Sequence, residues 1–236
     1  GINPYPADLF PVNHTSKQVK ENFEEGKKVI LAGRMMSDRD MGKASFVELQ
    51  DSEGRIQLYF NRDVLCPGDD KTLYNQVFRK LTDLGDFIGI EGELFMTKVG
   101  AMCIRVDDFK MLSKTLKPLP LPKTDEEGHV FDAFTDPELR YRMRYVDLVV
   151  NPQVKEVFMK RTKLFTAMRT FFNEAGYMEV ETPVLQSIPG GAAARPFITH
   201  HNSLDIPLYM RIANELYLKR LIVGGFDGVY EFSKNF

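Results

Sequence analysis

The sequence predicts two successive parts: a small barrel of strands, and then a domain of mixed helices and strands. Three observations predict this. Short strand-like runs dominate the first half, a long helical repeat begins only in the second half, and a proline-rich stretch at residues 116–124 separates them. Prolines at alternate positions exclude helix and central strand and favour a stiff, extended connector. We therefore expect domains at residues 1–115 and 136–236, joined by a connector at residues 116–135.

The first part contains five strand-like runs, with a helical segment between the third and the fourth. Leu73, Val77 and Leu81 recur at helical spacing within residues 71–82. The Asp-Ser-Glu-Gly sequence at residues 51–54 is typical of a hairpin turn. This order of elements is that of an OB-fold, a small barrel that often binds oligonucleotides. The five runs are residues 29–36, 45–50, 55–60, 87–95 and 102–109.

Helix boundaries are marked in both parts. Thr15 begins a capping box for a short helix, for which Gly26 is the expected stop. Asn151 precedes a proline at the first position of a long helix that ends at Gly176. A further helix is expected over residues 215–223. Together with strand-like runs at residues 178–181, 196–199, 208–212 and 229–232, these helices predict an α+β domain.

The long helix carries an apolar stripe with a 3.6-residue period. From the pattern alone, such a stripe indicates a face that is buried in the core of the chain. Its residues are Val154, Val157, Phe158, Leu164, Phe165, Met168, Phe171, Phe172 and Ala175.

Composition excludes several classes of protein. With 43% hydrophobic and 27% charged residues the chain is an ordinary globular sequence. It has no apolar run long enough for a membrane span and no signal-peptide pattern, so no membrane partner is expected. A net charge of −2 excludes a general cationic coat but leaves room for a local basic face. Cys66 and Cys103 make no disulfide framework, which favours a reducing compartment.

One face of the predicted hairpin combines aromatic and amide side chains. A tight turn places Phe46 opposite Tyr59 and Glu48 opposite Gln57, while the alternate residues form the barrel interior. A ring offers a stacking surface to a base, and an amide can read a base edge. The alternative is a mixed solvated face with one aromatic packed under the N-terminal helix, and the pattern leaves both open. The interior residues are Val47, Leu49, Ile56, Leu58 and Phe60.

Other candidate sites have less support in the sequence. His200 and His201 have no partners at zinc spacing, and Gly190 and Gly191 are not followed by the Lys-Ser/Thr of a phosphate loop. A basic and aromatic cluster either contacts RNA or a second subunit, or is a solvated helix face with buried tyrosines. Its members are Arg140, Tyr141, Arg142, Arg144 and Tyr145.

Three stretches of the second part carry a family resemblance: residues 176–183, residues 188–202 with their Gly-Gly-Ala-Ala-Ala-Arg run, and residues 209–220. They resemble class II lysyl-tRNA synthetases of the bacterial type, as an N-terminal portion that ends inside the second motif of that class. The glycine–alanine run is specific to the lysine enzymes. The resemblance covers essentially the whole chain and includes residues 33–36, 41–46, 229–232 and 235–236.

The resemblance implies an OB-fold that binds the anticodon of tRNA(Lys), and a class II catalytic domain with an antiparallel sheet. It implies activation of lysine by ATP to lysyl-adenylate, transfer of the lysyl group to tRNA, a Mg²⁺ ion that accompanies ATP, and a cytoplasmic homodimer. Phe46 and Gln57 match the stacking aromatic and the base-reading amide of the anticodon site. Arg34 is similar to a basic residue near the same site.

In the second part, Gly191 resembles a residue that lines the lysine pocket, and Glu215 resembles the carboxylate that holds the substrate α-ammonium. From its position alone Glu215 is a first-turn acid that favours the helix dipole. Pro183 is the signature proline of a dimer-interface motif made by the long helix and a strand over residues 179–185. Asn214 stands where proline is more usual.

The resemblance places the second motif's arginine, which clamps ATP in this family, beyond Phe236, together with the acidic magnesium ligands. No catalytic residue and no metal ligand is therefore assigned within the chain, and we expect it to lack adenylation activity by itself. Two alternatives remain: a non-catalytic module that binds the tRNA anticodon, and a related synthetase of the aspartate or asparagine type. The glycine–alanine run disfavours the second.

Overall fold

The computed structural model describes residues 2–125, 127–128, 130–131 and 133–236. The chain divides into two compact units, residues 1–146 and 147–236, and each is described by itself. None of the helices in the described ranges combines the length and the apolar character that a membrane crossing requires.

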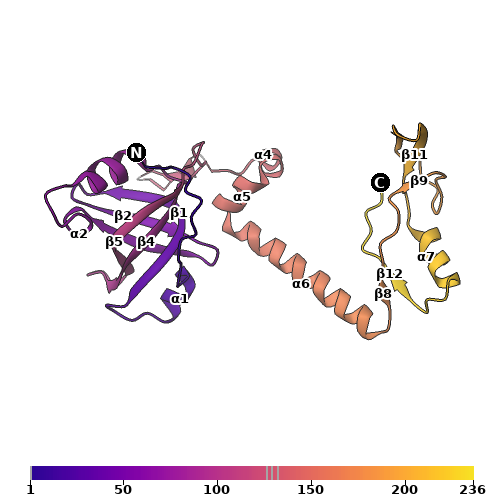
Figure 1. Ribbon diagram of the computed structural model, residues 1–236, viewed down its shortest axis with the longest axis horizontal. Coiled ribbons are helices and arrows are strands. Elements are labelled where there is room, and N and C mark those ends of the chain that lie inside the picture. Colours follow the sequence, from indigo (N-terminus) through magenta and orange to yellow (C-terminus); the bar gives the residue numbers. More distant parts are fainter. Residues whose placement is uncertain (1, 126, 129, 132) are drawn as a thin grey trace. The chain divides into compact units, whose positions relative to one another are not determined.

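Five strands of the first unit close into a barrel in the order β1-β2-β3-β5-β4 (Figure 1), which confirms the predicted OB-fold. All neighbouring strands are antiparallel except β3 and β5, which pair in parallel. The strands are β1 (Lys28–Asp40), β2 (Ala44–Gln50), β3 (Arg55–Asn61), β4 (Phe87–Met96) and β5 (Met102–Ser113).

The barrel core follows from the period-2 pattern of these strands. The five residues expected inside on β2 and β3 are all buried, because alternate side chains of a strand point to opposite faces. Phe60 stacks on Phe78 with 4.1 Å between ring centroids, and Phe109 meets both rings edge-on. Packing of this kind adds to the stability that burial of the rings provides.

The short helices of the first unit differ in part from the expectation. α1 (Ser16–Glu21) has the predicted Thr15 capping box but ends before Gly26. The segment predicted as one helix is a π-helical turn, η1 (Leu73–Phe78), followed by α3 (Arg79–Leu81). Val77 of the predicted stripe is buried, but the wider π turn adds Tyr74 and Phe78 to the buried face and leaves Leu81 55% exposed. A further short helix, α2 (Arg62–Leu65), follows β3.

The connector contains a small hairpin in addition to its extended proline run. Strands β6 (Lys123–Thr124) and β7 (Val130–Phe131) pair there. Two short helices follow, α4 (Pro137–Arg142) and α5 (Arg144–Val150). Tyr141 and Tyr145 of the basic and aromatic cluster are both exposed, so the expectation of buried tyrosines is wrong. The Arg144 guanidinium lies 5.0 Å from the centroid of the Tyr141 ring.

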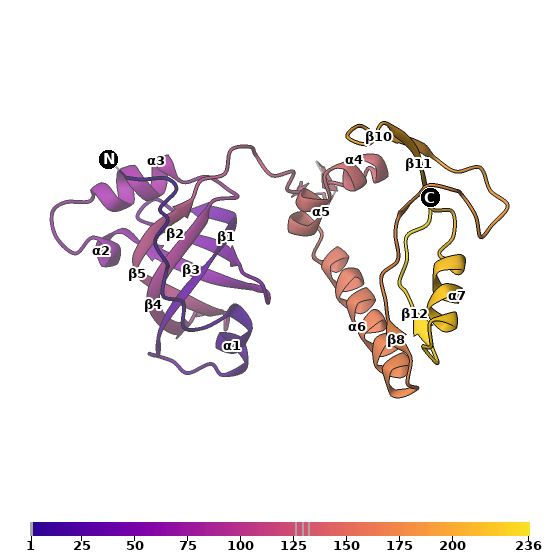
Figure 2. The same cartoon turned by 45° about the vertical axis from the view of Figure 1, so that its right-hand side comes forward.

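The second unit is the predicted α+β fold (Figure 2). Its antiparallel sheet has the order β10-β11-β9, whereas β12 and β8 pair in parallel. The expectation of one strand over residues 179–185 is wrong, because the segment is interrupted at Pro183, which has no backbone N–H to donate. The elements are α6 (Pro152–Glu174), β8 (Met178–Glu179), β9 (Leu185–Gln186), β10 (Ile198–His201), β11 (Ile206–Met210), α7 (Glu215–Val223) and β12 (Val229–Tyr230).

One side of the apolar stripe of α6 packs against the rest of the unit, and the other side is exposed. Phe172 stacks on Tyr230 with 4.7 Å between centroids, and Phe165 meets Phe232 at 4.9 Å. The expectation that the stripe forms core is therefore met on this side, and at the buried Val154. The other side of the stripe is exposed, with Phe171 at 67%. Its members are Val157, Phe158, Leu164, Met168 and Phe171.

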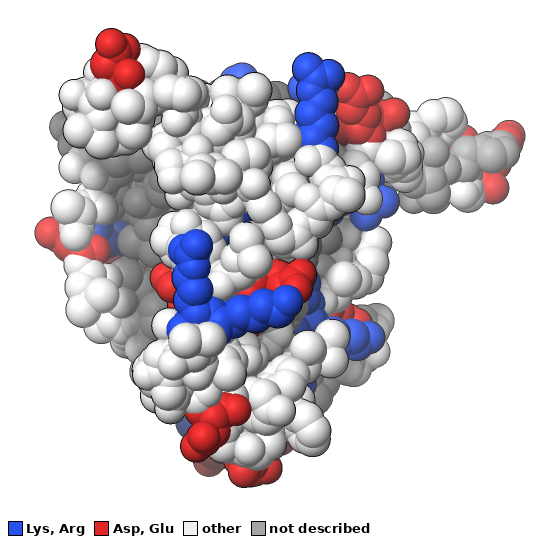
Figure 3. All heavy atoms as spheres, turned by 90° about the vertical axis from the view of Figure 1, so that its right-hand side faces the viewer, with Lys and Arg blue, Asp and Glu red and all other residues white. Residues whose placement is uncertain are grey.

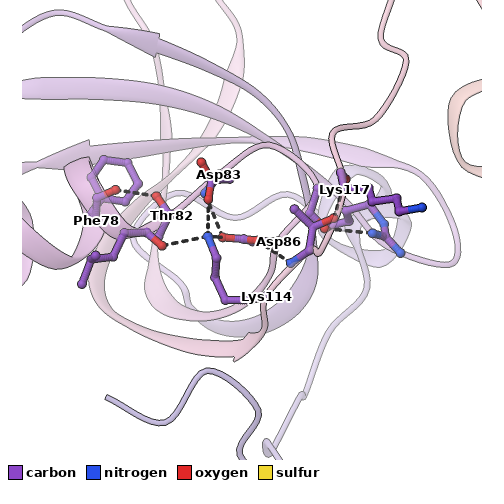
Figure 4. A network of polar contacts seen from close by, with 10 residues as sticks. Phe78, Thr82, Asp83, Asp86, Lys114 and Lys117 are labelled. Carbon is purple, nitrogen blue, oxygen red and sulfur yellow. Dashed lines mark hydrogen bonds and ion pairs between the residues drawn. The ribbon is translucent and has the colours of Figure 1, made fainter. Parts of the chain in front are cut away.

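A buried carboxylate fixes the point where the barrel meets the connector (Figure 4). Asp86 is fully buried and accepts hydrogen bonds from the backbone N–H of Asp83 at 2.8 Å, from that of Thr115 at 2.7 Å and from Lys114 Nζ at 2.7 Å. Lys114 also binds the exposed carboxylate of Asp83. Burial lowers the pKa of Lys114, but the hydrogen bonds to Asp83 and Asp86 outweigh it and hold that pKa above its usual value.

We expect Asp86→Ala to lower the free energy of unfolding by about 2–4 kcal/mol, because it removes three hydrogen bonds to a buried charge. Asp83→Ala removes an exposed partner of the same lysine and should cost less than about 1 kcal/mol. Urea unfolding of the 236-residue chain, followed by circular dichroism, measures both. Equal losses for the two variants would contradict this account of the network.

Candidate functional site

The outer face of the β2–β3 hairpin has the register that the turn predicted. Phe46 lies opposite Tyr59, and Glu48 opposite Gln57. The Phe46 and Tyr59 rings are 5.0 Å apart between centroids and tilted by 44°. Both rings are half-buried on the outside of the barrel. They therefore present an aromatic surface that is held in place and still accessible.

The Gln57 amide lies on this face without a hydrogen bond to any described residue. Its cross-strand neighbour Glu48 is held instead by Arg55, whose Nη1 is 2.8 Å from the carboxylate. The Nε of Arg55 donates to Gln50 at 2.7 Å. Because the amide carries both donors and an acceptor, it is free to pair with a polar edge presented beside the Phe46 ring.

Arg34 is on the same barrel but not at the same place. It pairs across the sheet with Gln50, four residues along β2 from Phe46 and so about 13 Å away at the backbone. Its Nη1 donates to the carbonyl oxygen of Gly85 at 2.8 Å, and its guanidinium lies 4.2 Å from the centroid of the Phe87 ring. Burial lowers its pKa. The structure brings Phe46 and Gln57 together and gives Arg34 contacts within the barrel.

Two further side chains, which the hairpin pattern did not indicate, lie beside the aromatic face. Phe95 of β4 meets Tyr59 edge-on at 5.8 Å, and the Arg39 guanidinium of β1 lies 5.3 Å from the centroid of the Phe46 ring. Both come from strands outside the hairpin. Their alternation along the strand was a signal for an outward position, but only closure of the barrel placed them beside these rings.

In the second unit, Gly191 and Glu215 lie against each other. Gly191 has a φ of +89°, which favours glycine. A Cβ at this position would be 3.3 Å from Cβ of Ala213 and 3.8 Å from Cβ of Glu215. The Gly191 backbone therefore lies close to the first turn of α7, where a side chain at this position would contact Ala213.

The Glu215 carboxylate is an available anion. Its side chain is 52% exposed and pairs with Lys219 one turn along α7, with 2.5 Å between Oε1 and Nζ. The hydrogen bond from Lys219 lowers the pKa of Glu215, so the group is ionised at neutral pH. An exposed carboxylate at a helix start can hold an ammonium group at short range.

A buried polar cluster that the sequence reasoning missed holds this helix in place. Arg211 and Glu231 form an ion pair at 2.8 Å, and both side chains are almost fully buried. Nη1 of Arg211 donates to the carbonyl oxygen of Thr182 at 3.0 Å. Asn214 occupies the N-cap position of α7 but forms no capping bond, and its amide donates to Glu231 at 3.0 Å. Charged residues inside strand-like runs were the available signal.

Burial of the Glu231 carboxylate raises its pKa, but the hydrogen bonds from Asn214, Thr182 and Arg211 outweigh this and lower it overall. The cluster is thus a satisfied buried charge pair and not a reactive one. Pro183 follows Thr182 in the segment between β8 and β9 and is exposed.

Phe236 lies beside the same cluster and is attached to it through the backbone. Its N–H donates to the carbonyl oxygen of Arg211 at 3.0 Å, and Nε of Arg211 donates to the carbonyl oxygen of Lys234 at 3.1 Å. The Phe236 side chain is exposed and has no group that could transfer a proton or bind a phosphate. The position of the ATP-clamping arginine beyond Phe236, which the family resemblance implies, stays a prediction.

The remaining candidates form no site for a metal ion. Within the described ranges no group of three or more His, Cys, Asp or Glu side chains is placed to hold one. His200 pairs with Asp205 at 3.1 Å, and His201 accepts from the backbone of Leu204. On the face shown in Figure 3, uncharged side chains cover most of the surface and the basic groups lie beside acidic ones. Burial raises the pKa of the Cys103 thiol to about 12, so it is unreactive.

Comparison with known families matches both units. Residues 29–112 match the OB-fold nucleic acid binding domain, and residues 136–236 match the class II tRNA synthetases for D, K and N.

Curated relatives match over the whole chain. A lysine–tRNA ligase of Christiangramia forsetii is 75% identical, one of Porphyromonas gingivalis W83 is 64% identical, and one of Azobacteroides pseudotrichonymphae is 62% identical. The chain spans 42% of the length of the first two relatives and 48% of the third. Together, the barrel, the α+β unit and these matches show that the chain belongs to the class II lysyl-tRNA synthetase family.

Proposed function

We propose that the chain is part of a lysine–tRNA ligase, which activates lysine with ATP to lysyl-adenylate and transfers the lysyl group to tRNA(Lys). The observation that carries the proposal is an accessible Phe46 ring beside a Gln57 amide that forms no hydrogen bond to any described residue, both on the outer face of an OB-fold. The 75% identity to a protein named lysine–tRNA ligase supports it.

In this proposal the barrel binds the anticodon. A base stacks on the Phe46 ring, which can accept any base because every base has a π-face. The Gln57 amide then forms hydrogen bonds with the edge of that base. Arg34 supports the face from within the barrel, since its guanidinium is engaged by Gly85 and Phe87. Direct contact of Arg34 with RNA would require it to leave those partners.

The second unit contributes part of the lysine pocket. Glu215 holds the α-ammonium of lysine, and the backbone at Gly191 lines the pocket beside it. Lys219, which pairs with Glu215 in this structure, gives way to the substrate ammonium. The Arg211–Glu231 pair positions the start of α7 and so acts through Glu215 without touching lysine.

ATP is the second substrate, and Mg²⁺ accompanies it. The described residues offer no cluster of acidic ligands, so no step is assigned to a metal ion here. We propose domain limits of 1–115 and 136–236 around the connector, a cytoplasmic location, and a homodimer whose interface includes the exposed side of α6 and Pro183. Because the chain spans less than half the length of its relatives, we assign the full activity to a protein of their length.

The two alternatives differ from this proposal in one measurable respect each. A non-catalytic anticodon-binding module would bind RNA and never support adenylation, even at the relatives' full length. An aspartate- or asparagine-type enzyme would activate its own amino acid and not lysine.

We expect Phe46→Ala to weaken binding of an RNA stem-loop with the lysine anticodon by about 5- to 150-fold, because a stacking ring contributes about 1–3 kcal/mol per base. Gln57→Ala should weaken it less and reduce discrimination between bases. Fluorescence anisotropy with the 236-residue chain measures both. Glu215→Ala is the control, since its carboxylate lies in the other unit, and loss of binding in that variant alone would contradict the assignment.

We expect Glu215→Gln, in a protein extended to the relatives' length, to raise the KM for lysine about 10- to 100-fold in ATP–pyrophosphate exchange, because a charged hydrogen bond to the ammonium is lost. Lys219→Ala keeps the carboxylate and should leave the KM unchanged or lower. The 236-residue chain should give no exchange. An equal rise in KM for both variants would show that the Glu215–Lys219 ion pair, and not the carboxylate by itself, determines the KM for lysine.

We expect Leu164→Lys to shift the proposed homodimer toward monomer by at least tenfold in its dissociation constant, because it buries a charge in an apolar interface. Sedimentation equilibrium measures the shift. Thr170→Lys adds the same charge outside the exposed apolar stripe, about 120° around α6 from Leu164, and should have little effect. Identical association of both variants and the parent would place the interface elsewhere.

A further inference from the structure

Arg211 lies where three segments of the second unit meet. Its backbone N–H donates to the carbonyl oxygen of Val184 at 2.9 Å, and its own carbonyl oxygen accepts from the N–H of Phe236 at 3.0 Å. Its guanidinium reaches the same two segments, because Nε donates to the carbonyl oxygen of Lys234 at 3.1 Å and Nη1 to that of Thr182 at 3.0 Å. This one residue therefore ties the segment before β9 to the segment that ends at Phe236.

These contacts depend on the shape of the guanidinium. The Arg211 side chain is only 4% exposed, and its Nη1 also donates to Oγ1 of Thr182 at 2.7 Å and pairs with Glu231 at 2.8 Å. A planar fork presents several donors at fixed angles, whereas the ammonium of a lysine is a single point on a flexible stem. A lysine at this position keeps the charge for Glu231 but leaves a buried carbonyl oxygen without its donor.

The same buried pair reaches the start of α7. Glu231 accepts a hydrogen bond from the Asn214 amide at 3.0 Å, and Asn214 directly precedes Glu215. Asn214 makes no capping bond with its side chain, so that side chain fixes the start of the helix through Glu231 instead. Arg211 thus holds the residues around Glu215 and the residues around Phe236 in one relation.

We propose that Arg211 is a positioning residue for both substrates of the activation step. This inference rests on the proposed function, in which Glu215 binds the α-ammonium of lysine and the residues that bind ATP follow Phe236. A lysine carboxylate oxygen attacks the α-phosphorus of ATP while the bond to the leaving pyrophosphate breaks, so the two substrates must be aligned closely. Nε and Nη1 of Arg211 are engaged by acceptors of the protein, so Arg211 acts through them and not on a substrate.

The test uses ATP–pyrophosphate exchange by a protein of the relatives' length. Arg211→Lys should raise the KM for lysine and the KM for ATP by about tenfold or more each, because both binding segments lose a buried charged hydrogen bond. Asn214→Ala breaks the contact to α7 alone and should raise the KM for lysine without changing that for ATP. Arg220→Lys is the matched control on the exposed side of α7, where Arg220 lies over the Tyr217 ring, and should change neither.

The division between KM and kcat separates positioning from stability. Unfolded molecules contribute no exchange, so a merely structural role would lower the apparent kcat and leave both KM values unchanged. Thr182→Val provides a second variant if Arg211→Lys folds poorly, because it keeps the shape of the side chain and removes the hydroxyl between Arg211 and Glu231. It should raise both KM values by about 2- to 10-fold, as expected for one hydrogen bond.

The outcomes separate this inference from the proposed function. If Glu215→Gln raises the KM for lysine, but Arg211→Lys and Thr182→Val leave the KM for ATP unchanged, positioning of both substrates by Arg211 is refuted and the proposed function stands. If Glu215→Gln leaves the KM for lysine unchanged, the proposed lysine site itself fails. A rise in both KM values of equal size in Arg220→Lys would also refute the special role of Arg211.

Discussion

The parallel pairing of β3 with β5 is the constraint on which the outer face of the barrel depends. It joins strands that are distant in the sequence and removes the edges that an open sheet would leave unpaired. Leu58 and Ile104 face the core between the outward pairs Gln57–Cys103 and Tyr59–Arg105. A shift of one residue would reverse every side chain, so the core pair of Leu58 and Ile104 keeps Gln57, Tyr59 and Arg105 on the outer face, with Cys103 buried beside Gln57.

The second unit depends on a polar interaction of the same importance. The buried Arg211–Glu231 pair connects Thr182, the start of α7 and the end of the chain through satisfied hydrogen bonds. In a low-dielectric interior such a network defines one arrangement, because any other leaves a charge without its partner. This allows Glu215 to be well positioned and still open to solvent, as its proposed role in holding an ammonium group requires.

The two units bury apolar surface to very different extents. The barrel has a dense core of aliphatic and aromatic side chains, whereas Val154 and Tyr230 are the buried apolar residues described in residues 147–236. Much of the apolar stripe of α6 remains exposed. A domain of this size is marginal with so small a core, and the exposed stripe supports the proposed association with further protein.

Local signals in the sequence determined much of the fold. The Thr15 capping box, the turn at residues 51–54 and the register of Phe46 against Tyr59 depend on residues close together in the chain, and they were predicted correctly. The Gly191 and Glu215 positions came from the family resemblance, and the structure places the two residues side by side. Hydrogen bonding between near neighbours and the alternation of side chains are sufficient for such features.

Only the tertiary structure decided the others. The π turn at Leu73–Phe78 and the divided stripe of α6 depend on what packs against them. The position of Arg105 beside Tyr59 depends on closure of the barrel. Periodicity gives the direction of a side chain relative to its own strand or helix, but it contains no information about which distant element lies opposite. That choice is made by the free energy of burying the whole core at once.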